Sequence, residues 1–130
     1  MSSVAVAAYA VLVALFCGSF INMAADRVPR RESVMRPRSH CRACDRQLNT
    51  VDLIPVAGYL LRGGRCATCR TPIGVSAPLV EAFAGALMLG AVVWLGVWPG
   101  VAVGAVLVAC FGLGVVALGV RRRPGQAEAR

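Results

Sequence analysis

The sequence predicts an all-α polytopic membrane protein with about three transmembrane helices. Its composition is the first observation, since 58% of the 130 residues are hydrophobic, 15% are charged, and the mean hydropathy is +0.69. Soluble domains carry about 25% charged residues. The second observation is that the apolar residues collect in three long uncharged stretches, and the third is that arginines cluster between and after them. These features exclude a water-soluble domain, a disordered chain, a collagen-like chain and a small disulfide-rich secreted protein.

Residues 1–25 are predicted to form the first transmembrane helix. The stretch from Val4 to Ala25 contains no charged residue, and as a helix it would rise about 33 Å, enough to cross a hydrocarbon core of about 30 Å. A cleaved signal peptide is the alternative, but such a peptide begins with a basic segment. Met1-Ser2-Ser3 carries no charged side chain, so a retained helix is the prediction.

Residues 77–98 and 101–120 are predicted to form the second and third transmembrane helices. Only Pro99-Gly100 separates the two apolar stretches. Because proline interrupts a helix and glycine permits a turn, we expect a tight hairpin at Trp98-Pro99-Gly100, with Trp94 and Trp98 at the membrane interface. A single kinked helix is the alternative, but it would be far longer than a bilayer requires.

The distribution of arginine predicts the orientation. Between Ala25 and Ser76 lie ten arginines and four acidic residues, and short cytoplasmic loops carry an excess of basic residues. We therefore expect the loop of residues 26–76 to be cytoplasmic and the N-terminus to lie outside. Three helices then place the tail of residues 121–130, which begins Arg121-Arg122-Arg123, in the cytoplasm as well.

A basic loop could also bind nucleic acid or anionic lipid. Topology already accounts for the charge, and Tyr59 is the only aromatic residue of the loop that could stack on a base. We therefore expect membrane lipid, and not nucleic acid, as a partner.

Four of the six cysteines form two pairs in this loop. Cys41-x-x-Cys44 and Cys66-x-x-Cys69 are separated by 21 residues, and paired CxxC sequences at about this distance are typical of tetrahedral zinc sites. The sequence thus predicts a cytoplasmic four-cysteine zinc-binding loop between transmembrane helices 1 and 2. Four protein ligands leave no open coordination position, so the zinc would be structural.

Other readings of the cysteines are two disulfides or a redox pair, which a reducing cytoplasm and the lack of alternating strands and helices disfavour. His40 precedes the first cysteine and could compete as a ligand.

Polar residues gather where the first helix is expected to leave the membrane. Ser19, Asn22 and Asp26 share one helical face, and Gly18 would let a neighbouring helix approach closely. This face is predicted to contact protein and not lipid.

Glu81, near the start of the second transmembrane helix, could pair with Arg27, bind a substrate amine, or lie solvated at the helix start. The candidate substrate or partner contacts are Asn22, Arg27, Arg62 and Glu81.

Several short motifs occur in a fixed order over about residues 14–90. They are Gly18-Ser19-Phe20-Ile21-Asn22, Arg27-Val28-Pro29, Glu32-Ser33, Arg38-Ser39-His40-Cys41, Asp52-Leu53-Ile54-Pro55, Leu61-Arg62-Gly63-Gly64-Arg65-Cys66 and Pro78-Leu79-Val80-Glu81. In order and spacing they resemble the N-terminal domain of bacterial type IV prepilin peptidases.

The resemblance implies a multi-pass protein of the bacterial inner membrane. These enzymes cleave prepilin leaders and methylate the new N-terminus, and their cysteine loop binds zinc. The resemblance therefore implies Zn2+ as cofactor at Cys41, Cys44, Cys66 and Cys69, with S-adenosylmethionine implied by resemblance alone. It also implies a prepilin or pseudopilin substrate, and a separate peptidase half or the secretion or pilus machinery as partner.

Two departures from the family limit what can be expected. The family's two proteolytic aspartates lie in a segment without counterpart here, so no catalytic residue is assigned and the chain is not expected to be a self-sufficient protease. Ser76-Ala77 stands where the family commonly has Arg-Tyr.

The leading interpretation is a prepilin peptidase N-terminal-domain protein, involved in prepilin or pseudopilin processing or N-methylation, that works with a separate aspartate-bearing half. The alternatives are a non-catalytic membrane scaffold with a structural zinc loop and an autonomous methyltransferase.

Overall fold

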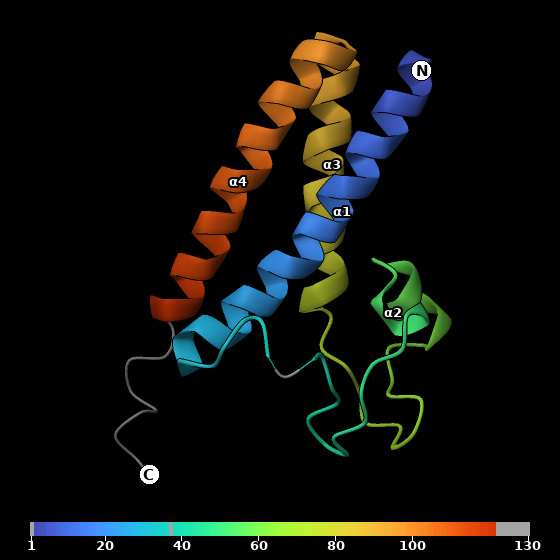
Figure 1. Cartoon of the computed structure of the whole chain (residues 1–130), viewed down its shortest axis with the longest axis vertical. Coiled ribbons are helices and arrows are strands. Elements are labelled where there is room, and N and C mark those ends of the chain that lie inside the picture. Colours follow the sequence, from blue (N-terminus) through green and yellow to red (C-terminus); the bar gives the residue numbers. More distant parts are fainter. Residues whose placement is uncertain (1, 37, 122–130) are drawn as a thin grey trace.

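Three long helices dominate the fold in the computed structural model (Figure 1). The structure describes residues 2–36 and 38–121. They are α1 (Ser3–Arg27), α3 (Ser76–Leu95) and α4 (Val97–Arg121), and each is long and apolar enough to cross a membrane. The predicted all-helical architecture with three candidate membrane spans is confirmed.

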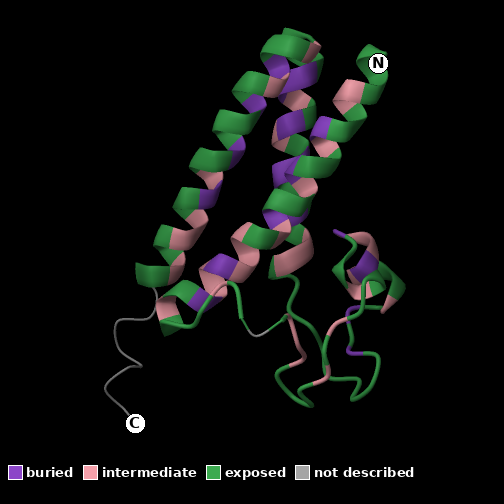
Figure 2. Cartoon of the chain, viewed as in Figure 1, coloured by how far each residue is buried: buried purple, intermediate pink, exposed green. Residues whose placement is uncertain are grey.

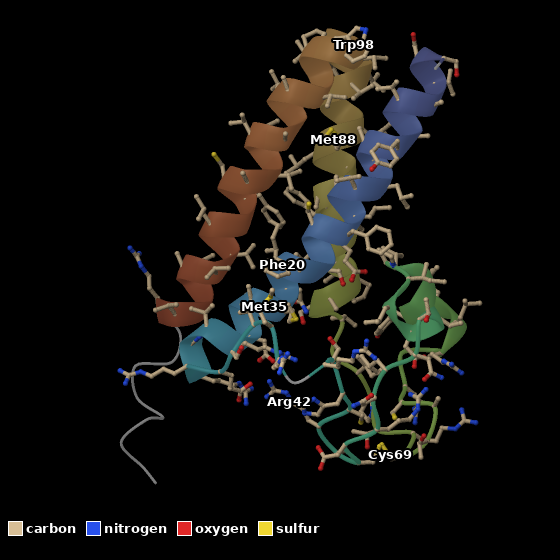
Figure 3. All side chains as sticks on the ribbon, in the orientation of Figure 1. Phe20, Met35, Arg42, Cys69, Met88 and Trp98 are labelled. Carbon is tan, nitrogen blue, oxygen red and sulfur yellow. The ribbon has the colours of Figure 1, made fainter. Side chains whose placement is uncertain are left out.

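The loop between α1 and α3 holds only short elements. They are the 3-10 turns η1 (Val28–Arg30) and η2 (Val51–Leu53) and the short helix α2 (Ala57–Leu61). In Figure 1 the loop lies beside the start of α3, at the end of the bundle where α1 and α4 finish. Figure 3 shows Trp98 at one end of the molecule and Cys69 at the other. The loop and the last turn of α4 therefore share one end of the bundle. Arg122, Arg123 and the rest of the predicted basic tail lie outside the described residues.

Small side chains form the core between the three helices, each of which packs against the other two. The buried cluster consists of Ala10, Ala14, Ala84, Met88, Val92 and Val108. Alanine lets helix backbones approach closely, which is how helices associate when lipid is the solvent. Large apolar side chains point outward instead, and Trp94 and Trp98 are 88% and 75% exposed. Figure 2 shows the same division between facing and outer surfaces.

The turn between α3 and α4 lies earlier in the chain than predicted. Gly96, with φ 82° and ψ 170°, separates the two helices, and Trp98-Pro99-Gly100 belongs to the first turn of α4. The predicted hairpin position was wrong because proline is tolerated in the first turn of a helix, where its missing N–H has no intrahelical partner. Gly100 serves packing instead, since a Cβ there would lie 2.5 Å from Val92 Cα.

Gly18 is a point of close approach between α1 and α3. A Cβ at this position would lie 2.6 Å from Glu81 Cα and 3.1 Å from the Val80 carbonyl oxygen. Both are backbone atoms, so a side chain fits only if the helices separate. The prediction that Gly18 admits a neighbouring helix is confirmed.

Substituting Gly18 with alanine is therefore expected to destabilise the bundle by about 1–3 kcal/mol, the usual cost of overpacking. Thermal unfolding of the purified protein in detergent measures the effect. Gly90→Ala is the matched control, because a Cβ at Gly90 of the same helix pair meets nothing within 4 Å. Equal melting temperatures for the two variants would contradict the packing argument.

Candidate metal centre

The first cysteine pair is held in a tight turn by the backbone. The Cys41 N–H donates to the Arg46 carbonyl oxygen (2.9 Å), and the Asp45 N–H donates to the Cys41 carbonyl oxygen (2.8 Å). Asp45 adopts the left-handed conformation, with φ 52°, a region that aspartate visits more readily than most residues. This turn brings the Cys44 sulfur back toward that of Cys41.

The second cysteine pair repeats the same turn. The Cys66 N–H donates to the Thr71 carbonyl oxygen (3.0 Å), and the Arg70 N–H donates to the Cys66 carbonyl oxygen (3.1 Å). Arg70 occupies the left-handed position, with φ 58°. Two segments distant in sequence thus form matching turns, each with two thiols on one side.

The two turns face each other so that the four sulfurs form one cluster. The Sγ atoms of Cys41, Cys44, Cys66 and Cys69 all lie within 4.8 Å of one another. The Cys41–Cys69 distance is 3.7 Å and the Cys44–Cys66 distance is 3.9 Å. A tetrahedral zinc with bonds of about 2.3 Å separates its sulfurs by about 3.8 Å. The cluster therefore has dimensions that could hold a metal ion.

The thiols of Cys44, Cys66 and Cys69 differ in their affinity for a proton. Hydrogen bonds from the backbone N–H groups of Cys69 and Thr68 lower the pKa of Cys66 to about 6, against the opposing effect of burial. The hydroxyl and backbone of Thr71 lower the pKa of Cys69. The pKa of Cys44 is raised to about 11, because desolvation and the neighbouring thiols together outweigh the backbone hydrogen bond from Arg46. Thiolates are the metal-binding form, so the lowered pKa values favour that form at Cys66 and Cys69.

Asp52 ties the first turn to the end of α2 and was not predicted as a site residue. Its carboxylate, 6% exposed, binds Arg46 Nη2 at 2.8 Å and Arg62 Nε at 2.6 Å, and it accepts the Asn49 N–H at 3.0 Å. Burial alone would raise the pKa of Asp52, but these three donors lower it. The sequence offered two signals, since Asp52 is one of four acidic residues among the ten arginines of the loop and opens the motif Asp52-Leu53-Ile54-Pro55.

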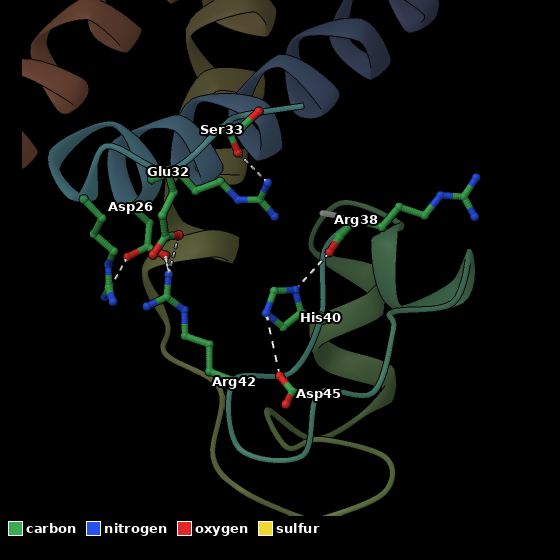
Figure 4. Close-up of polar contacts among 9 residues, drawn as sticks. Asp26, Glu32, Ser33, Arg38, His40, Arg42 and Asp45 are labelled. Carbon is green, nitrogen blue, oxygen red and sulfur yellow. Dashed lines mark hydrogen bonds and ion pairs between the residues drawn. The ribbon is translucent and has the colours of Figure 1, made fainter. Parts of the chain in front are cut away.

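A second group of charges fastens the first turn to the end of α1 (Figure 4). Arg42, between the first two cysteines, binds the Asp26 carboxylate through Nη2 and lies 3.9 Å from Glu32 Oε2. Arg30 also binds Asp26, at 3.2 Å. Of the polar face predicted to contact protein, Asp26 therefore contacts the cysteine loop, whereas Ser19 and Asn22 line cavities beside it.

His40 contacts its own turn. Its Nδ1 lies 3.0 Å from the Arg38 carbonyl oxygen, and its Nε2 lies 4.0 Å from the Asp45 carboxylate (Figure 4). Among the described residues, the cluster that could hold a metal ion consists of the four cysteines and does not include His40.

Three of the four candidate contact residues make internal contacts. Arg62 binds Asp52, and the buried Arg27 donates from Nη1 to the Ser33 carbonyl oxygen (2.9 Å). Glu81 is 7% exposed, and its Oε2 accepts the Val56 N–H at 2.6 Å. The Glu81–Arg27 pair considered from the sequence does not form.

Asn22, the fourth candidate, lines two cavities. One, of about 760 Å³, lies between the end of α1 and the first cysteine turn. The other, of about 180 Å³, lies between the loop and the facing polar residues of α1 and α3.

The sequence of this region matches a known protein family. The bacterial peptidase A24 N-terminal domain matches residues 12–95. Similar proteins include the prepilin leader peptidase/N-methyltransferase of Burkholderia pseudomallei strain K96243, which is 34% identical over 114 residues, covering 68% of this chain and 37% of the relative. The protein of the same name from Myxococcus xanthus is 40% identical over 81 residues, covering 62% and 24%. That from Bacillus subtilis is 34% identical over 83 residues, covering 64% and 34%.

The chain thus spans only about a third of the length of such relatives, and no solved structure matches it. The matched residues contain α1 from residue 12 onward, all four clustered cysteines and α3. On this evidence the chain belongs to the bacterial peptidase A24 N-terminal domain family.

Proposed function

We propose that this chain is the zinc-binding, membrane-embedded N-terminal part of a prepilin-processing system in the bacterial inner membrane. The observation that carries the proposal is the four-sulfur cluster fastened to the ends of α1 and α3 within the family-matched residues. The relatives are named prepilin leader peptidase/N-methyltransferase, and the proposed substrate is accordingly a prepilin or pseudopilin.

The metal is proposed to be a structural Zn2+ held by Cys41, Cys44, Cys66 and Cys69. The donor set supports zinc, since four thiolates at tetrahedral spacing suit this ion. Bound zinc would cross-link the two cysteine turns and neutralise part of the negative charge of the four thiolates. Its four protein ligands leave no position for a water or substrate, so the chemistry of processing has to come from other groups.

The orientation is proposed to place the N-terminus outside and the cysteine loop in the cytoplasm. The ten arginines of the loop support it. So does the end of α4, whose last residue is Arg121, because α4 ends at the same end of the bundle as the loop (Figure 1). In that orientation the loop would hold the leader of a prepilin near the membrane, and the larger cavity beside α1 offers room for a peptide segment.

Cleavage is proposed to use aspartates supplied by a separate peptidase half. An aspartic protease needs two adjacent carboxyl groups that share a proton. Here Asp26 and Asp52 bind arginines, and the Asp45 side chain is 92% exposed. The chain's contribution is then to bind and position the substrate. A role in methyl transfer is suggested by the relatives' names alone, and S-adenosylmethionine as the methyl donor by the family resemblance alone.

Co-expression tests the proposal in a strain that lacks its own prepilin peptidase. With an aspartate-bearing peptidase half, this chain is expected to restore leader cleavage, measured as the mass of the pilin subunit, whereas either half alone is not. Cys66→Ala should abolish the restoration, and Cys110→Ala, outside the cluster, should not. Unprocessed prepilin with both halves present would contradict the proposal. Restoration that persists without the four clustered cysteines would favour the scaffold interpretation of the loop.

A further inference from the structure

An uncharged apolar segment lies in the middle of the arginine-rich loop. Residues 53–61 contain no charged side chain and include all of α2. The two charged residues that flank the segment, Asp52 and Arg62, bind each other at 2.6 Å, so their charges compensate each other. A loop that is otherwise strongly basic therefore contains a stretch whose side chains have little reason to stay in water.

The leucines of α2 point away from the rest of the protein. Leu60 and Leu61 are 68% and 70% exposed, whereas Gly58 of the same short helix is buried. A Cβ at Gly58 would lie 2.7 Å from the carbonyl oxygens of Val51 and Asp52, so this side of α2 packs against the loop. Neighbouring exposed apolar side chains commonly mark a surface that contacts an apolar partner.

The contact between α2 and α3 sets the depth of the short helix. Val56, which caps the start of α2, donates its N–H to Glu81 Oε2 at 2.6 Å. The 20 residues of α3 extend over about 30 Å, which is the thickness of a hydrocarbon core. Glu81 lies about 8 Å along this helix from Ser76, and helical side chains lean toward the helix N-terminus. Val56 therefore lies between the levels of Ser76 and Glu81.

This level is that of an interfacial helix, which lies about 5–10 Å into the boundary between headgroups and acyl chains. Figure 1 shows α2 beside the start of α3. The cysteine turns lie elsewhere, since Figure 3 places Cys69 at the end of the molecule opposite Trp98. Within the loop, it is thus α2 that lies at the depth of the membrane boundary.

The backbone at both ends of α2 is paired internally, as a segment in contact with lipid requires. At its start, three successive N–H groups have acceptors within the chain, those of Val56, Ala57 and Gly58. At its end, three carbonyl oxygens accept N–H groups from the turn of residues 62–64, those of Gly58, Tyr59 and Leu60. Val56 has φ 59°, a costly conformation for a β-branched residue, so the hydrogen bond to Glu81 helps to hold the start of α2 in place.

We propose that α2 is an interfacial element of the membrane domain, with Leu60 and Leu61 inserted among the acyl chains of the leaflet on the side of the cysteine loop. Glu81 anchors α2 at this depth through Val56. Asp52 connects the end of α2 to the first cysteine turn, so the insertion holds the metal centre at a fixed distance from the bilayer. The proposal depends on α3 being a membrane span and not on prepilin processing.

Photo-labelling of the unmodified chain tests the proposal. The chain is reconstituted in nanodiscs of phosphatidylcholine that carries a diazirine in its acyl chains, and it is illuminated and then digested with trypsin. Arginines at positions 46, 62, 65 and 70 release residues 47–62 and 66–70 as separate peptides. We expect attached lipid on the first peptide, located by tandem mass spectrometry within residues 57–61. The second peptide, from the same loop, is the matched control and should carry almost none.

Tryptophan fluorescence gives a second measurement, in a background with Trp94→Phe and Trp98→Phe. Lipid brominated in its acyl chains should quench Leu61→Trp about as strongly as Leu113→Trp, a reference position whose side chain is exposed on α4. Thr68→Trp is the control, because Thr68 is exposed in the second cysteine turn, and it should lose little fluorescence.

Lipid labelling within residues 57–61 supports the proposal. Labelling there no stronger than in residues 66–70 of the unmodified chain would overturn it, whether or not the variants fold. A separate peptidase half is the other possible cover for the two leucines. If labelling of residues 57–61 disappears when such a half is reconstituted together with this chain, protein and not lipid covers them, and the proposal is overturned as well. Because the readout is lipid contact and not leader cleavage, either result would leave the proposed function standing.

Discussion

Replacing Cys66 with alanine is expected to abolish metal binding and to unfold the loop while α1, α3 and α4 remain folded. Cys66 is 2% exposed, the most buried of the four clustered cysteines, and its sulfur lies 3.9 Å from that of Cys44. Structural zinc contributes about 10–16 kcal/mol of binding free energy in zinc-finger peptides. A loop with little buried apolar surface cannot replace a contribution of that size.

Zinc analysis of the purified protein measures this effect directly. The unmodified chain should carry about one zinc and Cys66→Ala close to none, as expected when one of four ligands is removed. Cys110→Ala is the matched control, since Cys110 lies on α4 outside the cluster. A full equivalent of zinc on Cys66→Ala would show that the four sulfurs do not act as one site.

Replacing Asp52 with asparagine is expected to loosen the loop by about 3 kcal/mol, the usual cost of breaking a buried ion pair from one side. The substitution leaves Arg46 and Arg62 without their shared carboxylate. Because 1.4 kcal/mol corresponds to a factor of ten, local opening should become about 100-fold more frequent. Hydrogen exchange of the loop amides, followed by mass spectrometry, reports this frequency.

Asp45→Asn is the matched control for Asp52→Asn. The Asp45 side chain is 92% exposed, and its one ion pair within the described residues, to His40, spans 4.0 Å, so exchange should barely change. Equal exchange in Asp52→Asn and Asp45→Asn would contradict the bridging role of Asp52.

The same ion pairs make the stability of the loop depend on pH. The folded loop lowers the pKa of Asp52 from its ordinary value of 3.8. The contribution of Asp52 to stability is therefore fully present above that value and is lost as the pH falls through the lower folded pKa.

The helices and the cysteine cluster were predictable because each has a local signature. Uncharged stretches of bilayer length indicated α1, α3 and α4, and the CxxC spacing indicated four sulfurs in one site. The position of the turn between α3 and α4 was not predictable in this way. Pro99 and Gly100 are common both in turns and in the first turn of a helix, and only packing against Val92 distinguishes the two for Gly100.

The contacts that attach the loop were not predictable because they join residues far apart in the sequence. Arg42 meets Asp26 across 16 positions, and Glu81 meets Val56 across 25. An arginine in a basic loop has many possible acidic partners, and the sequence alone does not rank them. Arg62 was singled out as a candidate external contact, yet it binds Asp52 within the same loop.

X-ray absorption spectroscopy at the zinc edge of the purified chain tests the central claim most directly. Four sulfur neighbours at about 2.3 Å are expected, with no nitrogen or oxygen in the first coordination shell. A shell containing nitrogen or oxygen, or a protein without zinc whose cysteines are paired as disulfides, would contradict a four-thiolate metal centre.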